Sequence, residues 1–156
     1  MTMQEGILIR RVLPEEAAQL SRVALAAKRH WGYPERWIEA WTPQLTYDPD
    51  YFVQNESWAF ELDHGPVAFY TLLEKNGTAW LENLWVTPEC IGKGIGKELF
   101  LHAVDLARRR GYTLLQLEAD PNAAGFYEKM GMHKIAERHS EVDGQPRALP
   151  IMEMAL

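Results

Sequence analysis

The chain has 156 residues, a formal net charge of −6 and a single cysteine, so it is long enough for one domain with its own hydrophobic core. The acidic balance disfavours a nucleic-acid partner, and a lone cysteine excludes an internal disulfide and suits a reducing compartment. No apolar run reaches the roughly 18 residues of a membrane-spanning helix, so no membrane association is expected. We therefore expect one cytoplasmic domain over residues 1–156.

The first part of the chain is predicted to form a strand and two helices. Pro14 opens the longer helix with two glutamates in its first turn, where negative charge is favoured. Its apolar residues recur at helical spacing. The next helix lies in a segment rich in aromatic residues, and the stretch after it holds prolines and reads as a loop with one helical turn. The expected ranges are a strand at 7–12, helices at 14–30 and 35–41, and the turn at 51–54.

The second part is predicted to be a sheet interrupted by two helices. Asn76-Gly77 is a strong signal for a β-hairpin, so three antiparallel strands precede the long helix. A helix of that length is a crossover, so the next strand runs parallel to the strand before it. The expected strands are 57–62, 67–74, 78–86, 113–119, 134–141 and 149–154, with helices at 94–110 and 123–130. The fold class is therefore a mixed, largely antiparallel α/β sheet with one parallel β-α-β crossover and helices on both faces.

The segment from Leu84 to Lys97 joins an apolar strand to that long helix through a glycine-rich loop. Glycines at 92, 94 and 96 leave one face of the backbone free of side chains. The first N–H groups of the helix are unpaired and lie at the positive end of its dipole. Such a loop can bind a phosphate or pyrophosphate. Neither the Walker A spacing nor the Rossmann fingerprint fits, because Ile91 and Lys97 occupy required glycine positions.

Two motifs in this half resemble those of the GNAT N-acetyltransferases, and the resemblance covers about Thr78 to Met132. The first is the acyl-CoA loop, matched by Leu84, Val86, Pro88, Gly94 and Gly96. The second is the signature after the next strand, matched by Ala123, Phe126, Tyr127, Glu128, Lys129 and Gly131. Two positions depart from the family pattern: Ile91 replaces the usual Gln or Arg, and Asp120 replaces the usual Asn.

The resemblance implies a GNAT-like fold in which the two parallel strands splay apart and admit the pantetheine arm of acetyl-CoA. It implies acetyl-CoA as the co-substrate and an amine of a small molecule or peptide as the acceptor. The implied cofactor-binding residues are Leu84, Trp85, Val86, Ile91, Gly92, Lys93, Gly94, Ile95, Gly96, Lys97, Asn122 and Tyr127.

Direct transfer needs a neutral amine, a donor for the developing oxyanion and a proton for the departing thiolate. The resemblance places Tyr127 beside the CoA sulfur as the proton donor; the alternative is a buried tyrosine with a satisfied hydroxyl. The oxyanion donor would be a backbone N–H near Trp85 or Val86. Many family members carry a carboxylate at the position of Trp80, so Glu82, two residues on, is the candidate base, with a solvated or structural glutamate as the alternative. The five histidines form no pair, so no metal is proposed.

The acceptor side is implied to lie in the segment between the first two strands. Its aromatic residues could line an acceptor pocket, and could hold a cation over a ring face; the alternative is packing in a core or lid. These residues are Trp31, Tyr33, Trp37 and Trp41. Glu35 and Glu39 could attract an amine, or could be solvated helix residues.

The leading prediction is an acetyl-CoA-dependent N-acetyltransferase. The alternatives are a non-catalytic acyl-CoA-binding or sensor domain, kept open by the Ile91 and Trp80 departures, and a nucleotide-binding protein, disfavoured by the failed motif counts. The oligomeric state stays open, with a homodimer as one candidate.

Overall fold

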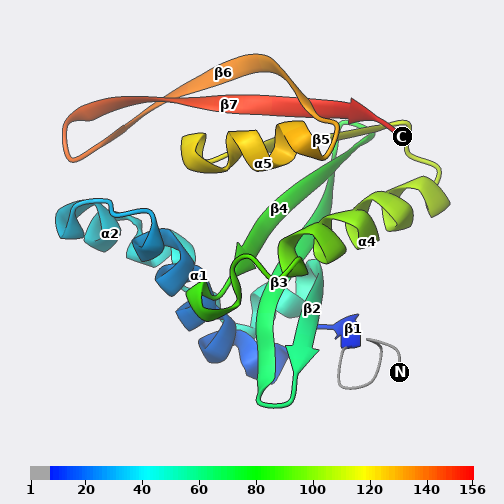
Figure 1. The fold of residues 1–156 in the computed structure, drawn as a ribbon, viewed down its shortest axis with the longest axis horizontal. Helices are drawn as coiled ribbons and strands as arrows, with labels where there is room; N and C mark the ends of the chain where they lie inside the picture. Colours follow the sequence, from blue (N-terminus) through cyan, green and yellow to red (C-terminus); the bar gives the residue numbers. More distant parts are fainter. Residues whose placement is uncertain (1–7) are drawn as a thin grey trace.

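The computed structural model describes residues 8–156 and contains a seven-stranded sheet in the order β1-β2-β3-β4-β5-β7-β6 (Figure 1). The one parallel pair is β4 with β5, and the other neighbours are antiparallel. The predicted fold class is thereby confirmed. Residue 7, where we expected the first strand to begin, lies outside the described residues. The strands are β1 (Leu8–Arg11), β2 (Glu56–Leu62), β3 (Gly65–Lys75), β4 (Thr78–Val86), β5 (Leu114–Glu118), β6 (His133–Val142) and β7 (Gln145–Ala155).

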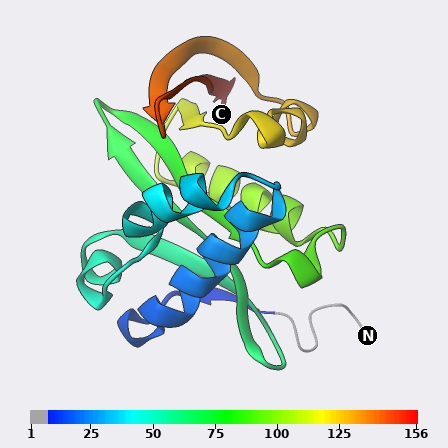
Figure 2. The ribbon, with the colours of Figure 1, turned by 90° about the vertical axis from the view of Figure 1, so that its left-hand side faces the viewer.

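Helices cover both faces of the sheet (Figures 1 and 2). One face packs on α4, whose residues Leu99 and Phe100 are fully buried in a core with Leu81 and Leu115 of the sheet. The other face packs on α1 and α3 in a second core, which contains Phe69. The apolar residues at helical spacing predicted for the first long helix form its buried face, and α4 likewise buries one face. The helices are α1 (Ala17–His30), α2 (Glu35–Trp41), α3 (Pro49–Gln54), α4 (Ile95–Arg109) and α5 (Ala124–Lys129).

Several elements are longer than the sequence predicted, and for two of them the cause is a local turn or cap. The helix α3 begins at Pro49 instead of residue 51, because the Asp48 carboxylate accepts the Tyr51 N–H at 3.0 Å and caps the first turn. The strand β7 begins at Gln145 instead of residue 149. Its hairpin closes through Asp143 and Gly144, both at positive φ, so pairing with β6 starts directly after the turn.

The parallel strands β4 and β5 stay together for only a short distance. Their paired positions are Ala79 with Leu115 and Trp80 with Gln116. Beyond this point β5 continues beside β7, whereas β4 turns away toward α1 (Figure 1). Within the described chain, the edge of β4 over residues 81–86 therefore has no strand partner on the β5 side. This agrees with the splayed strands that the family resemblance implied.

A β-bulge interrupts β4 just where the two strands part. The pairing with β3 shifts between Thr71–Glu82 and Phe69–Trp85, and Asn83 has φ 63°. Before the bulge, Ala79 and Leu81 face the α4 core. After it, Leu84 and Val86 face that core, while Trp85 packs on the α1 side.

Candidate active site

The loop between β4 and α4 presents a row of free backbone N–H groups. Gly92 and Gly94 adopt φ of 86° and 82°, which favours glycine. The first backbone bond of α4 joins the Glu98 N–H to the Gly94 carbonyl at 3.0 Å. In the described chain the N–H groups of residues 92–97 have no backbone acceptor. They lie at the start of a 15-residue helix and can bind an anion.

The third glycine of the loop, Gly96, lies beside side chains of β4 and α5. A Cβ at Gly96 would stand 3.6 Å from Val86 Cγ2 and 3.7 Å from Phe126 Cζ. These are ordinary van der Waals distances, and they place the start of α4 beside both β4 and α5. Ile91, which replaces the family's polar residue, is 47% exposed, and its side chain offers no hydrogen bond to a ligand.

Tyr127 lies in α5, on the other side of the gap that β5 leaves along β4 (Figure 1). Its ring is buried against Phe100 and Phe126, at centroid distances of 5.9 and 5.1 Å. Burial raises the pKa of its hydroxyl, and the Asp120 carboxylate raises it further. In residues 8–156 this hydroxyl has no hydrogen-bond partner, which differs from the satisfied structural tyrosine considered above.

Glu82 faces the α1 side of the sheet, at the bulge. One of its oxygens accepts the Tyr51 hydroxyl at 3.0 Å. Burial, together with the Glu82 charge, raises the pKa of Tyr51 to about 12, so Tyr51 remains a donor at neutral pH. Asn83 completes the group, since its amide donates to Tyr51 and its carbonyl accepts the Tyr47 hydroxyl, both at 2.7 Å. The second Glu82 oxygen has no partner in the described chain and is available to a water or an amine.

Three of the four predicted acceptor-side aromatics form one cluster. Tyr33, Trp37 and Trp41 lie with ring centroids 5.0 to 5.9 Å apart. Trp31 is separate from them: the residue is 40% exposed, and its ring neighbours that of His30. Glu35 pairs with Arg29 at 3.3 Å at the surface, so its charge is already matched.

Two side chains of the protein itself occupy the positions where a cation would contact the rings of this cluster. Lys28 Nζ stands 4.3 Å from the Trp41 ring centroid and 5.1 Å from that of Tyr33. The Arg147 guanidinium lies 5.0 and 5.1 Å from the same two rings. A substrate cation over these rings, as the sequence suggested, would have to displace one of these side chains.

Lys28 and Asp120 form a buried ion pair at 2.7 Å, with side chains 11% and 8% exposed. Burial lowers the pKa of Lys28, although Asp120 opposes this. Burial alone would raise the pKa of Asp120, but the pKa is lowered by the hydrogen bond and charge of Lys28 together with the hydrogen bonds from the Asn122 N–H and Tyr33. Asp120 also accepts the Tyr33 hydroxyl at 2.9 Å. The replacement of the family's Asn by Asp at position 120 thus has a physical partner in Lys28.

The sequence reasoning missed Lys28 and Arg147. Lys28 did carry a signal, because it continues the buried stripe of α1 four residues after Ala24, where a lysine needs a partner. Arg147 carried none, since it reaches the cluster from the distant hairpin. Asn122, predicted to bind the cofactor, directs its amide to Tyr33 at 2.9 Å and to Asp120 at 3.0 Å.

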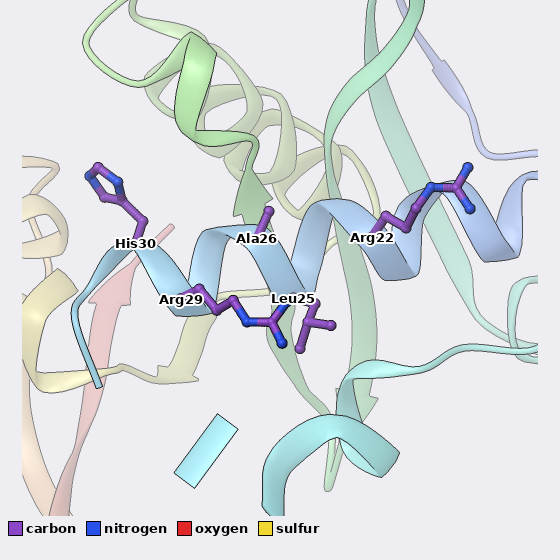
Figure 3. A pocket seen from close by; sticks show the side chains of 5 residues that line it. All are labelled: Arg22, Leu25, Ala26, Arg29 and His30. Carbon is purple, nitrogen blue, oxygen red and sulfur yellow. The ribbon is translucent and has the colours of Figure 1, made fainter. Parts of the chain in front are cut away.

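A shallow groove of about 500 Å³ runs along the outer side of α1 (Figure 3). Its lining includes none of the residues predicted to act in the site. In the described residues, no three His, Cys, Asp or Glu side chains gather as metal ligands. No helix in that same part of the chain is long and apolar enough to cross a membrane.

Comparison with known proteins places this geometry in a family. Residues 21–132 match the acetyltransferase (GNAT) family. The peptidyl-lysine N-acetyltransferase YjaB of Salmonella typhimurium is 34% identical over 106 residues, which cover 67% of this chain and 68% of the relative. A GCN5-related N-acetyltransferase from Rhodopseudomonas palustris has a structure similar at TM-score 0.82, with 26% identity over 100% of this chain and 99% of that one.

The fold is also that of the PaiA N-acetyltransferase from Thermoplasma acidophilum, solved in complex with coenzyme A. Here the TM-score is 0.77 and the identity 24%, over 96% of this chain and 99% of that chain. The predicted class of enzyme, an N-acetyltransferase among the acyltransferases, is confirmed by these relatives. The chain belongs to the GNAT family of acetyltransferases.

Proposed function

We propose that the protein transfers an acetyl group directly from acetyl-CoA to an amine of a small molecule or peptide. One observation carries the proposal. The anion-binding loop and the free hydroxyl of Tyr127 flank the stretch of β4 from which β5 has parted. The pyrophosphate would lie on the N–H groups of residues 92–97, and the pantetheine arm along the free edge of β4.

The oxyanion donor can be assigned to one N–H from the hydrogen-bond pattern. The Thr87 N–H donates to Val67 of β3 at 2.9 Å. Successive N–H groups of a strand point to opposite edges, so the Val86 N–H points to the edge that β5 leaves. We therefore choose Val86 over Trp85 as the donor to the thioester oxygen as negative charge develops there.

The remaining proton transfers would involve two side chains. Glu82 takes the proton of the attacking amine through a water, using the oxygen that Tyr51 leaves free. The amine nitrogen then bonds to the acetyl carbon, and the carbon–sulfur bond breaks. Tyr127 gives its proton to the departing sulfur. Its raised pKa keeps this proton in place across the neutral range, and solvent restores it afterwards.

The central claim is tested by Gly94→Asp. The new carboxylate would stand at the anion site, so CoA affinity measured by calorimetry should fall. Gly111→Asp is a matched control, because Gly111 has a similar φ of 86°, open space around its Cβ position and a place at the other end of α4. Equal CoA affinity in both variants and the parent, with intact folds, would refute the loop assignment. CoA binding without turnover of any amine would favour the non-catalytic alternative.

A further inference from the structure

The charges around the aromatic cluster do not balance. Two cations contact the rings of the cluster, Lys28 and Arg147, and within the described residues only Lys28 has an acidic partner. Lys28 pairs with Asp120, Arg36 with Asp143 at 3.1 Å, and Arg138 with Glu118. Arg147, in contrast, donates only to the neutral Tyr33 hydroxyl, at 2.8 Å. Among residues 8–156 it forms no ion pair, although it is half-buried. The cluster therefore carries an excess of one positive charge.

The surroundings of Arg147 hold its guanidinium in one orientation. Its central carbon lies 5.0 Å from the Trp41 ring centroid, 5.1 Å from that of Tyr33 and 6.0 Å from that of Trp37. The Tyr33 hydroxyl cannot form another hydrogen bond, since it accepts from Arg147 and Asn122 and donates to Asp120. A guanidinium fixed by rings loses little conformational entropy when it binds a ligand.

The cluster borders the proposed reaction centre on two sides. Lys28 Nζ lies 5.9 Å from the ring centroid of Trp85 on β4. On the other side, the Asp120 carboxylate accepts the Asn122 N–H at 2.9 Å and caps the turn that leads into α5, the helix that carries Tyr127. A molecule whose amine approaches the thioester can thus place a second group against the cluster.

We infer that the acceptor amine also carries a carboxylate, and that Arg147 binds it. The guanidinium has five N–H donors in a planar fork that matches a carboxylate, and one of them is engaged by Tyr33. An acceptor carboxylate would neutralise the unmatched charge, whereas a second ammonium group would meet Lys28 and Arg147 as like charges. This inference rests on the proposed function and narrows its acceptor to amino-acid-like amines or peptides with an acidic group nearby.

The test compares acceptors that differ only in this group. Amino acids would be assayed beside their carboxamides and their decarboxylated amines, for example lysine, lysinamide and cadaverine, with release of CoA thiol as the readout. Phosphoethanolamine beside ethanolamine would show whether a phosphate is preferred instead. We expect at least one amino acid to exceed its carboxamide by about tenfold or more in kcat/KM, mainly through KM.

Variants then assign the preference to one side chain. Arg147→Met should remove most of the advantage of the acid and change the rate with the carboxamide by less than about twofold. Arg138→Met is the matched control, since it removes the same charge from the same hairpin but outside the cluster, and it should keep the preference. The inference is overturned if the protein binds CoA but acetylates no amino acid faster than the corresponding carboxamide. It is also overturned by a preference for phosphate over carboxylate, or if Arg147→Met lowers kcat/KM equally for the amino acid and its carboxamide. If the unaltered protein does not bind CoA, the proposed function itself is refuted.

Discussion

Tyr127→Phe should separate catalysis from stability more cleanly than any other substitution in the site. The variant loses one oxygen that has no hydrogen-bond partner in the described chain, and it keeps the buried ring against Phe100 and Phe126. The free energy of unfolding should therefore change by less than about 0.5 kcal/mol. Tyr47→Phe is the matched comparison. It breaks a 2.7 Å bond and leaves the Asn83 carbonyl unpaired, which should cost about 1–3 kcal/mol.

The activity of Tyr127→Phe should fall by about 10² to 10⁴, the usual worth of a positioned proton donor. This corresponds to roughly 2.7–5.5 kcal/mol of transition-state stabilisation. Single-turnover transfer with enzyme in excess is the proper assay, because product release can limit kcat. Lower pH should restore part of the rate, since solvent can then protonate the thiolate. An unchanged single-turnover rate would show that the sulfur leaves without help from this residue.

Two further predictions concern stability. Lys28→Met strands a buried carboxylate and should cost about 3–5 kcal/mol in urea unfolding, with Asp120→Leu in the same chain restoring most of it; a loss below about 1 kcal/mol would contradict the buried pair. The pKa is raised for five of the six tyrosines, to about 12 for Tyr33 and Tyr51, with burial as the first cause in each. Because these folded-state values exceed the unfolded value near 10, their stabilisation is complete below about pH 10 and is lost above it. Phenolate absorbance should thus rise together with unfolding seen by circular dichroism, and ionisation of all the tyrosines near pH 10 in a folded protein would refute this.

The strands, the two long helices and the glycine-rich loop between β4 and α4 could be predicted because their signals are local. Glycine spacing, apolar periodicity and the Asn76-Gly77 turn each depend on residues within one or two elements. The Asp48 cap was local as well, but the prolines around it read as loop. The N–H groups of this loop belong to the main chain. The presence of Ile91 in place of a polar residue therefore does not change their capacity to donate hydrogen bonds.

The charged cluster could not be predicted in the same way. Its ion pair joins residues 92 positions apart, and Arg147 reaches Tyr33 across 114 positions. The number of aromatic rings suggested a site for the cation of a substrate. Only the three-dimensional arrangement shows that Lys28 and Arg147 already lie over these rings. The sequence also placed Trp31 with the other rings, because neighbours along a helix end do not reveal which side chains turn outward.

The extra residue in β4 determines which side chains of this strand face the α4 core beyond the bulge. Without the bulge, a regular two-residue alternation continued from Ala79 and Leu81 would turn Leu84 and Val86 over to the α1 side. The Val86 methyl would then leave Gly96, and the first turn of α4 would lose its contact with the strand. A relative with one residue fewer here would keep the same faces only as a regular strand, and it would lack the amide that joins Tyr47 and Tyr51 in this chain.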